Sequence, residues 1–307
     1  MLEKRGWLVN DCLTTIPNTK TFWHDLLGWM PGLVDQTGGY TDYRHLADAI
    51  EKKAEEDGVP DYIIRNATFF RRLNIPAKTV CLLQDYYPKE KHQLPVCNSS
   101  DVVVFNSPFT HSLYRDRVTS RTEIVPLGTD FDHFSPGEDS SDELGILPNS
   151  VLFVGAANDY PKGFDVVKEL IDTTSFNICL VMKDDFQISH PRVRVFNRVS
   201  RDLIHKVYNS CKIMLCTSRM ETQHLSGIEA AACGLPVVAT NVGVYFGKEH
   251  GEWGRKATGA ASFAKEIRYV LNNYDSFRPR EHFLSLGYDQ TSCKNHWADI
   301  VSGLFTG

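Results

Sequence analysis

The chain has 307 residues, of which 42% are hydrophobic and 23% are charged, a composition that excludes fibrous and intrinsically disordered proteins. Its length predicts about two domains, because a single hydrophobic core rarely grows beyond roughly 250 to 300 residues. The formal net charge of −5 argues against a protein whose main task is to hold the phosphate backbone of a nucleic acid, since such domains are usually basic.

Short apolar runs alternate with longer segments of helical periodicity along the whole chain, which favours an α/β architecture with parallel sheets. The expected strands are residues 7–9, 62–64, 79–83, 102–105 and 123–125, followed by 151–154, 177–182, 193–196, 213–216 and 236–240. The expected helices are residues 42–56, 164–171, 200–210, 227–233 and 262–272.

Residues 136–149 are rich in proline, glycine, serine and acidic residues, and they predict a linker. The expected organisation is one Rossmann-like domain over residues 1–135, a second over residues 150–285, and a last segment, 286–307. Two such domains place a ligand in the cleft between them, at the carboxyl ends of the strands. A dinucleotide dehydrogenase is the alternative, but the chain carries no Gly-x-Gly-x-x-Gly fingerprint after its first expected strand or elsewhere.

The eight cysteines form no Cys-x-x-Cys pair and lie mostly in apolar segments such as 80–82 and 178–180. They predict buried thiols in a reducing compartment. The chain begins without the apolar segment of a signal peptide, and no run approaches about 18 apolar residues. We therefore expect a cytoplasmic protein with no stable membrane insertion.

The most informative segment runs from Glu221 to Glu229, where seven residues separate two carboxylates and a helix is expected to begin near Ser226 and Gly227. The free N–H groups of a first helical turn, at the positive end of the helix dipole, attract a pyrophosphate. A carboxylate in the second turn can accept hydrogen bonds from the hydroxyls of a ribose. The segment therefore predicts a sugar-nucleotide site, with Glu229 on the ribose and Glu221 on the sugar.

The Glu-x7-Glu spacing and the sequence that follows it, Ala-Ala-Ala-Cys-Gly-Leu-Pro-Val-Val-Ala-Thr (230–240), resemble the donor-site signature of glycosyltransferase family 4. The members of this family are retaining enzymes with the GT-B fold. The alternative, an ordinary helix with two solvated glutamates, does not account for residues 230–240. The likeness is clearest from about residue 101 to 243. It implies that residues 150–285 bind the nucleotide sugar and that a helix within 286–307 returns to the first domain.

Family members bind the donor pyrophosphate with an arginine and a lysine after the first strand of this domain. Gly155 ends that strand and Lys162 matches the lysine, but Ala156 stands at the arginine position. A lost charge-assisted contact costs about 1.5 to 3 kcal/mol. A solvated turn lysine is the alternative interpretation of Lys162. Three cations at neighbouring strand ends could replace the arginine: Lys183, Arg198 and Arg219.

The resemblance also implies donor contacts with Val199 and, in the first helical turn, with Ser226, Gly227 and Ile228. His224 stands where the family frequently has glycine. The donor sugar is therefore expected to be smaller, or to be held by Gln223 and His224 directly. The expected catalytic residues are Glu221, Lys162 and His224.

On the acceptor side, Gln84 and Asp85 follow a strong expected strand, where many family members have histidine and aspartate. Gln84 cannot act as an acid or base at neutral pH. We therefore expect a front-face, retaining transfer in which the departing phosphate oxygen takes the acceptor proton, while Lys162 stabilises the negative charge. An inverting reaction would need a base, for which Asp85, Asp25 and His24 are the candidates.

Arg65, Arg71 and Arg72 flank two phenylalanines, 69 and 70, and could hold a nucleic-acid or phosphorylated acceptor. The alternative is an amphipathic segment with buried phenylalanines and solvated arginines. The expected acceptors are thus a glycan, a small molecule or a modified nucleic-acid base.

Asp184 and Asp185 follow a strand and could bind a divalent cation, but solvated loop aspartates are the preferred interpretation. The histidines show no zinc-binding spacing. We therefore expect a metal-independent hexosyl- or pentosyltransferase with no cofactor beyond a UDP- or GDP-linked sugar as co-substrate. The second hypothesis, motivated by Ala156 and the missing glycines, is a catalytically weak relative that binds nucleotide sugars or glycans.

Overall fold

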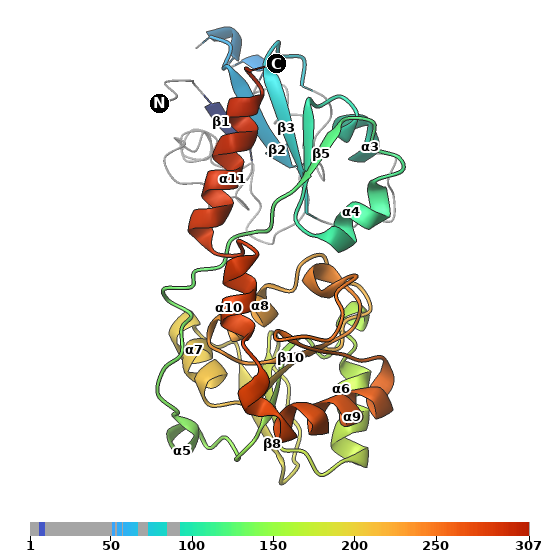
Figure 1. Cartoon of the computed structure of the whole chain (residues 1–307), viewed down its shortest axis with the longest axis vertical. Coiled ribbons are helices and arrows are strands. Elements are labelled where there is room, and N and C mark those ends of the chain that lie inside the picture. Colours follow the sequence, from blue (N-terminus) through green and yellow to red (C-terminus); the bar gives the residue numbers. More distant parts are fainter. Residues whose placement is uncertain are drawn as a thin grey trace. The chain divides into compact units, whose positions relative to one another are not determined.

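The computed structural model describes residues 6–9, 51–52, 54–56, 58–66, 73–84 and 93–306. The chain divides into two compact units: the first comprises the chain up to Leu127 together with Thr291–Gly307, and the second comprises Gly128–Gln290. Each unit contains one parallel sheet (Figure 1). The α/β fold with two parallel sheets, expected from the sequence, is therefore confirmed.

The sheet of the first unit has the order β1-β2-β3-β4-β5, with every pair parallel. Its strands are β1 (Gly6–Val9), β2 (Tyr62–Asn66), β3 (Lys78–Leu83), β4 (Val102–Phe105) and β5 (Arg121–Ile124). Its described helices are α3 (Gln93–Cys97), α4 (Pro108–Tyr114) and α11 (Gln290–Gly303).

Both faces of this first sheet are covered by helices. One face packs Ile64 and Leu82 against Trp297 of α11, and the other packs Phe105 against α3 and Tyr114 of α4. A sheet buried on both faces needs apolar side chains at successive positions of each strand. This requirement explains why the strands read as continuous apolar runs in the sequence.

The sheet of the second unit has the order β11-β10-β9-β6-β7-β8 and is also parallel throughout. Its strands are β6 (Val151–Gly155), β7 (Ile178–Met182), β8 (Val193–Asn197), β9 (Ile213–Cys216), β10 (Val237–Ala239) and β11 (Gly254–Lys256). Its helices are α5 (Ser141–Leu144), α6 (Phe164–Thr173), α7 (Arg201–Asn209), α8 (Leu225–Ala232), α9 (Gly259–Asn272) and α10 (Pro279–Ser285).

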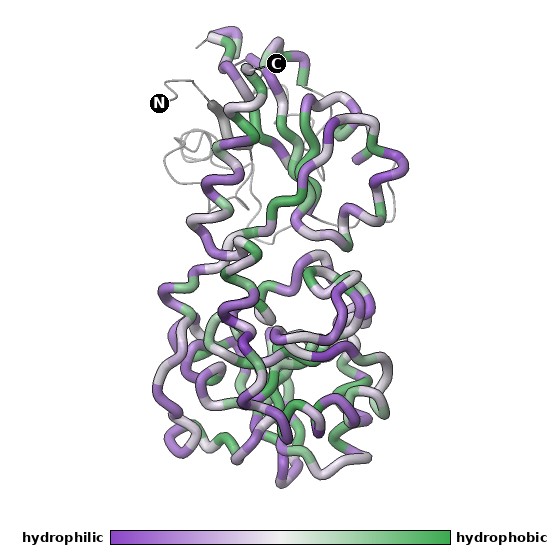
Figure 2. Tube along the Cα trace, viewed as in Figure 1, coloured by the Kyte–Doolittle hydropathy of each residue, from purple (hydrophilic) through white to green (hydrophobic). Residues whose placement is uncertain are grey.

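One face of the second sheet is closed by α6 and α9, whose Phe164 and Phe263 pack with Phe153, Leu180 and Leu215 of the strands. In Figure 2 the green, hydrophobic stretches follow the strands of each sheet. Helix α8 contacts β9 and β10. The strand order therefore sets α8 close to the loops that leave β6 and β9.

The segment expected to be a linker, residues 136–149, belongs to the second unit. It contains α5, and its Leu144 and Ile146 are buried. The backbone N–H of Gly137 donates to Asn209 Oδ1 at 2.8 Å, and Arg194 Nε donates to the carbonyl of Leu144 at 2.8 Å. The composition of this segment does not reveal these contacts, because they join it to residues about 50 to 70 positions away in the sequence.

The ten expected strands occur within one or two residues of their expected bounds, which is the usual uncertainty of an element end. β11 was not expected, because its Gly-Arg-Lys sequence has no apolar pattern. Helices α3, α5 and α10 were not expected either. Nor was α4, although Ser107 caps this helix by accepting from Thr110 N at 3.1 Å and Pro108 is its first residue. Of the helix expected at 42–56, only residues 51–52 and 54–56 are described, and these are helical.

All cysteines within the described residues are buried and free: 81, 97, 179, 211, 216, 233 and 293. Cys12 lies outside the described residues. Within the described part of the chain, no helix is both long and apolar enough to span a bilayer.

Candidate functional site

The expected donor-site residues lie in loops at the carboxyl edge of the second sheet, after β6 and β9. These loops are joined to one another. Thr217 Oγ1 donates to the carbonyl of Lys162 at 2.9 Å, and the backbone N–H of Arg219 donates to the carbonyl of Pro161 at 2.7 Å. Because the carboxyl ends of parallel strands share one edge, residues separated by more than 50 positions meet here.

Lys162 and Glu221 form an ion pair at this edge, between Nζ and Oε2. The Lys162 side chain is 31% exposed and that of Glu221 is 14% exposed. Ser218 Oγ also approaches Glu221 Oε2, at 3.5 Å. The structure therefore brings together two of the three expected catalytic residues. A half-buried ammonium beside a carboxylate can exchange this partner for the oxygens of a diphosphate, because Lys carries three donors on a flexible stem.

His224 precedes the first residue of α8 and adopts φ = 73°, in the left-handed region that favours glycine. Its ring is buried, and Nδ1 lies 3.0 Å from the hydroxyl of Tyr245. The pKa of His224 is lowered to about 4, mainly by burial; the Glu221 charge opposes this shift and the Lys162 charge adds to it. The imidazole is thus neutral at neutral pH, so it is a hydrogen-bonding group there and not a general acid.

Helix α8 begins at Leu225, two residues before the expected range of 227–233. A Cβ atom at Gly227 would lie 2.2 Å from His224 Nδ1 and 2.2 Å from the Tyr245 hydroxyl. Only glycine leaves room for this buried pair beside the first helical turn. The expected donor-binding residues Ser226, Gly227 and Ile228 all lie in that turn, where N–H groups and the dipole favour an anion.

Lowering the pH is expected to destabilise the protein through His224. Its folded pKa of about 4 lies below the ordinary 6.5, so the unfolded state binds a proton first as the pH falls. The stabilisation is complete above about pH 6.5 and is lost toward pH 4, by about 3 kcal/mol in total. Urea unfolding of the wild type and His224→Gln should show this loss as a change in their stability difference. Parallel pH profiles of the two proteins would contradict the prediction.

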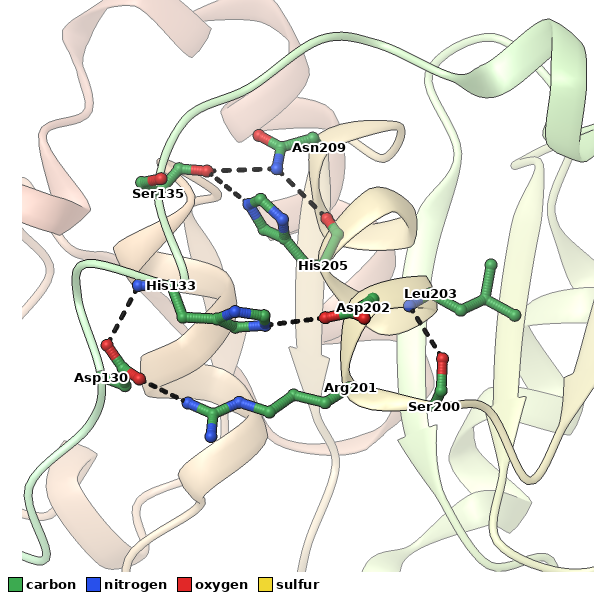
Figure 3. Close-up of polar contacts among 9 residues, drawn as sticks. All are labelled: Asp130, His133, Ser135, Ser200, Arg201, Asp202, Leu203, His205 and Asn209. Carbon is green, nitrogen blue, oxygen red and sulfur yellow. Dashed lines mark hydrogen bonds and ion pairs between the residues drawn. The ribbon is translucent and has the colours of Figure 1, made fainter.

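Glu229 lies in the second turn of α8, and its Oε2 accepts a hydrogen bond of 2.8 Å from the hydroxyl of Tyr208 on α7. Burial raises the pKa of Glu229; the Tyr208 bond and the charges of Arg201 and His133 act in the opposite direction. Figure 3 shows Arg201 and His133 among the contacts that join α7 to residues 130–135. Arg201 and Tyr245 were not expected at the site, because no local pattern links these residues to it.

The three cations considered as replacements for the missing arginine have different environments. Arg219 is held by Asp165 of α6, at 2.8 and 2.5 Å, and its guanidinium lies 4.4 Å from the centre of the Tyr160 ring. Arg198, with φ = 50°, donates to Asp185 at 2.8 Å, and both side chains are exposed. Their neighbour Val199 is half-buried.

Lys183 is exposed and directly follows β7, and its backbone N–H donates to the carbonyl of Gly155 at 2.9 Å. Gly155 pairs with Met182 in the register of the sheet, so Lys183 lies at the same edge as Ala156. Within the described part of the chain, Lys183 makes no ion pair. Of the three cations, Lys183 is thus the one that lies at the strand end next to Gly155 and Ala156 without an ion-pair partner among the described residues.

The acceptor-side candidates are only partly described. Arg65 is 1% exposed in β2, between β1 and β3, so it presents no guanidinium on the surface and differs from both interpretations made from the sequence. Gln84, directly after β3, is also buried, and its backbone carbonyl accepts from Asn106 Nδ2 at 3.2 Å. The remaining candidates lie outside the described residues: Asp85, Arg71, Arg72, His24 and Asp25.

Among the described residues, no group of three or more His, Cys, Asp or Glu side chains lies close enough to hold a metal ion. Asp185 is engaged by Arg198.

Residues 148–273 match a family model described as "Glycosyl transferases group 1". A curated relative, D-inositol 3-phosphate glycosyltransferase of Mycobacterium sp. (strain JLS), is 29% identical over 144 residues, which cover 40% of this chain and 33% of the relative. The match thus spans a third of the length of that relative. The matched region of the family model contains Lys162, Glu221 and Glu229.

Solved structures resemble nearly the whole chain. HepE of Anabaena, solved in complex with UDP, superimposes with a TM-score of 0.73 at 16% identity, covering 98% of this chain and 100% of that one. Sucrose-phosphate synthase of Thermosynechococcus elongatus gives a TM-score of 0.69 at 20% identity, covering 85% and 78%. The chain therefore has the GT-B fold of these glycosyltransferases.

Proposed function

We propose that this protein is a glycosyltransferase that moves a sugar from a nucleotide-diphosphate donor to an acceptor hydroxyl. The observation that carries this proposal is the convergence of Lys162, Glu221 and the amino end of α8 at one sheet edge. This edge lies inside the segment that matches group 1 glycosyl transferases. The UDP and UDP-glucose complexes of HepE support a uridine donor, with GDP as the alternative.

In this proposal the diphosphate lies against the first turn of α8, and Lys162 exchanges Glu221 for the phosphate oxygens. Glu229 accepts hydrogen bonds from the ribose, while Glu221 is released to the hydroxyls of the sugar. Lys183 supplies the positive charge of the arginine whose position Ala156 occupies. The backbone near Arg198 and Val199 borders the base. His224 supports the turn as a neutral hydrogen-bonding group.

The proposed transfer retains configuration and needs no protein base or metal. The bond between the anomeric carbon and the β-phosphate oxygen breaks, and the acceptor oxygen bonds to that carbon from the same face. The departing phosphate oxygen takes the acceptor proton. Lys162 and the helix end stabilise the negative charge that develops on the phosphate. The acceptor is a saccharide or small molecule; burial of Arg65 removes one of the three arginines that favoured a nucleic acid.

Calorimetry with UDP and GDP, followed by turnover assays with a panel of their hexose and pentose conjugates, tests this function. We expect one nucleotide to bind at micromolar concentration and Glu229→Gln to weaken it about tenfold, because a neutral amide is a poorer acceptor for the ribose hydroxyls. Binding of inorganic pyrophosphate should stay unchanged in this variant. If neither nucleotide binds, the proposal fails.

The second candidate function, a nucleotide-sugar or glycan-binding protein with weak catalysis, is favoured by Ala156 and by the burial of His224. The same turnover assays distinguish the two functions. Binding of a nucleotide sugar without transfer or hydrolysis, on every acceptor tried, would favour the binding protein. Release of the nucleoside diphosphate that depends on Lys162 would favour the enzyme.

A further inference from the structure

We propose that Tyr208 is a positioning residue for the nucleotide: its hydroxyl fixes the carboxylate of Glu229 so that the other carboxylate oxygen meets the ribose hydroxyls. This inference rests on the proposed function, because it assigns Glu229 to the ribose. Tyr208 itself contacts no ligand. It acts through Glu229, from a different helix.

The contact between the two helices is short and buried. Tyr208 is 0% exposed, and its hydroxyl donates to Glu229 Oε2 at 2.8 Å. A carboxylate offers two oxygens, and no hydrogen bond to Oε1 is found among the described residues. Because Oε2 is held by Tyr208, Oε1 points in a defined direction. Two vicinal hydroxyls that donate hydrogen bonds at the same time require such a fixed acceptor.

Tyr208 lies on α7 between residues that anchor this helix, and Figure 3 shows the contacts of these anchoring residues. Arg201 Nη2 donates to Asp130 Oδ2 at 2.8 Å. His205 Nε2 lies 2.9 Å from the carbonyl of Ser135, and Asn209 Nδ2 donates to the same carbonyl at 3.1 Å. These three hydrogen bonds hold α7 against residues 130–135, which lie near the start of the second unit. The Tyr208 hydroxyl is therefore held in one position relative to Glu229 on α8.

The aromatic ring and the electrostatics favour the same role. The Tyr208 ring packs edge-on against Phe134, with 5.8 Å between the ring centres. Burial and the neighbouring Glu229 raise the pKa of Tyr208 well above its ordinary value, so the hydroxyl remains a donor. Its hydrogen bond lowers the pKa of Glu229, against the effect of burial. Tyr208 therefore also keeps the carboxylate ionised and able to accept.

A residue needed only for packing would be replaced by phenylalanine without loss, because the ring is unchanged. The test compares the binding of UDP with that of 2′,3′-dideoxy-UDP, which lacks both ribose hydroxyls, to the wild type and to Tyr208→Phe. We expect Tyr208→Phe to weaken UDP binding about tenfold and to leave the binding of 2′,3′-dideoxy-UDP unchanged. The affinity of the variant for UDP should also fall at a higher pH than that of the wild type, since Glu229 then protonates more readily.

Tyr114 offers a matched control in the first unit. It is also 0% exposed, and its hydroxyl donates to Gln93 Oε1 at 2.8 Å. Tyr114→Phe should leave the ratio of the affinities for UDP and 2′,3′-dideoxy-UDP at its wild-type value. In the double variant Tyr208→Phe/Glu229→Gln, the loss should not exceed that of Glu229→Gln alone, because both changes affect one contact.

Equal weakening of both ligands by Tyr208→Phe, or no weakening of either, would overturn the inference. An unfolded Tyr208→Phe protein would also overturn it, since the hydroxyl would then serve folding rather than positioning. These results differ from a failure of the proposed function, in which the wild type itself would bind neither UDP nor GDP, or would bind without sensitivity to Glu229→Gln.

Discussion

Replacing Lys162 by methionine is expected to lower kcat/KM for the nucleotide sugar by roughly 10²- to 10³-fold, the effect of removing one group that stabilises charge in a transition state. The side chain keeps most of its length and loses its charge. Lys162 is the cation that contacts Glu221 at the sheet edge, and the proposed reaction places the developing negative charge there. Initial-rate kinetics with a saturating acceptor provide the measurement.

Two further variants make this result specific. Lys168→Met, on the exposed side of α6, removes a lysine whose ammonium lies over the Phe164 ring, and it should leave kcat/KM unchanged. Lys162→Met/Glu221→Gln removes both charges of the ion pair and should be no more active than Lys162→Met. Wild-type rates in Lys162→Met would contradict the assignment of this residue to the donor phosphates.

The second large effect is expected at Gly163, where alanine should destabilise the protein by about 2 to 5 kcal/mol. Its φ is +67°, and a Cβ atom there would lie 2.1 Å from the backbone carbonyl oxygen of Thr217. The cost combines left-handed strain with a clash against backbone that cannot move independently of β9. Because Gly163 directly follows Lys162, the displaced turn should also weaken nucleotide binding. Urea unfolding and calorimetry measure the two effects.

Gly247 supplies the matched comparison, since its φ is +72° and nothing lies within 4 Å of the position of a Cβ atom. Gly247→Ala therefore carries the strain without the clash, and we expect a loss of about 1 to 2 kcal/mol. The difference in unfolding free energy between the two variants measures the cost of the clash between the loops that follow β6 and β9. Equal destabilisation by both variants would show that these loops can move apart and that the clash costs little.

Local patterns predicted every described strand except β11, because burial on two faces leaves its mark within each strand. Of the described helices they predicted α6, α7, α8 and α9. Residues 102–105 and 213–216 are apolar without interruption, and both strands are fully buried. β11 left no such mark: it lies at the end of the strand order, beside β10, and its Gly254 and Lys256 offer neither periodicity nor an apolar run. The start of α8 at Leu225 was not expected because His224, which occupies the N-cap position, is not one of the usual N-cap residues and makes no side-chain cap hydrogen bond.

The sequence by itself determined the α/β class, the parallel sheets and the two glutamates near the amino-terminal end of α8, since each depends on residues close together in the chain. Only the tertiary structure decided which side chains meet: Lys162 with Glu221, His224 with Tyr245, Tyr208 with Glu229, and Arg65 with the interior. These pairings depend on strand order and helix packing. Contacts across 20 to 60 positions are set by the burial of whole elements, and no local spacing encodes them.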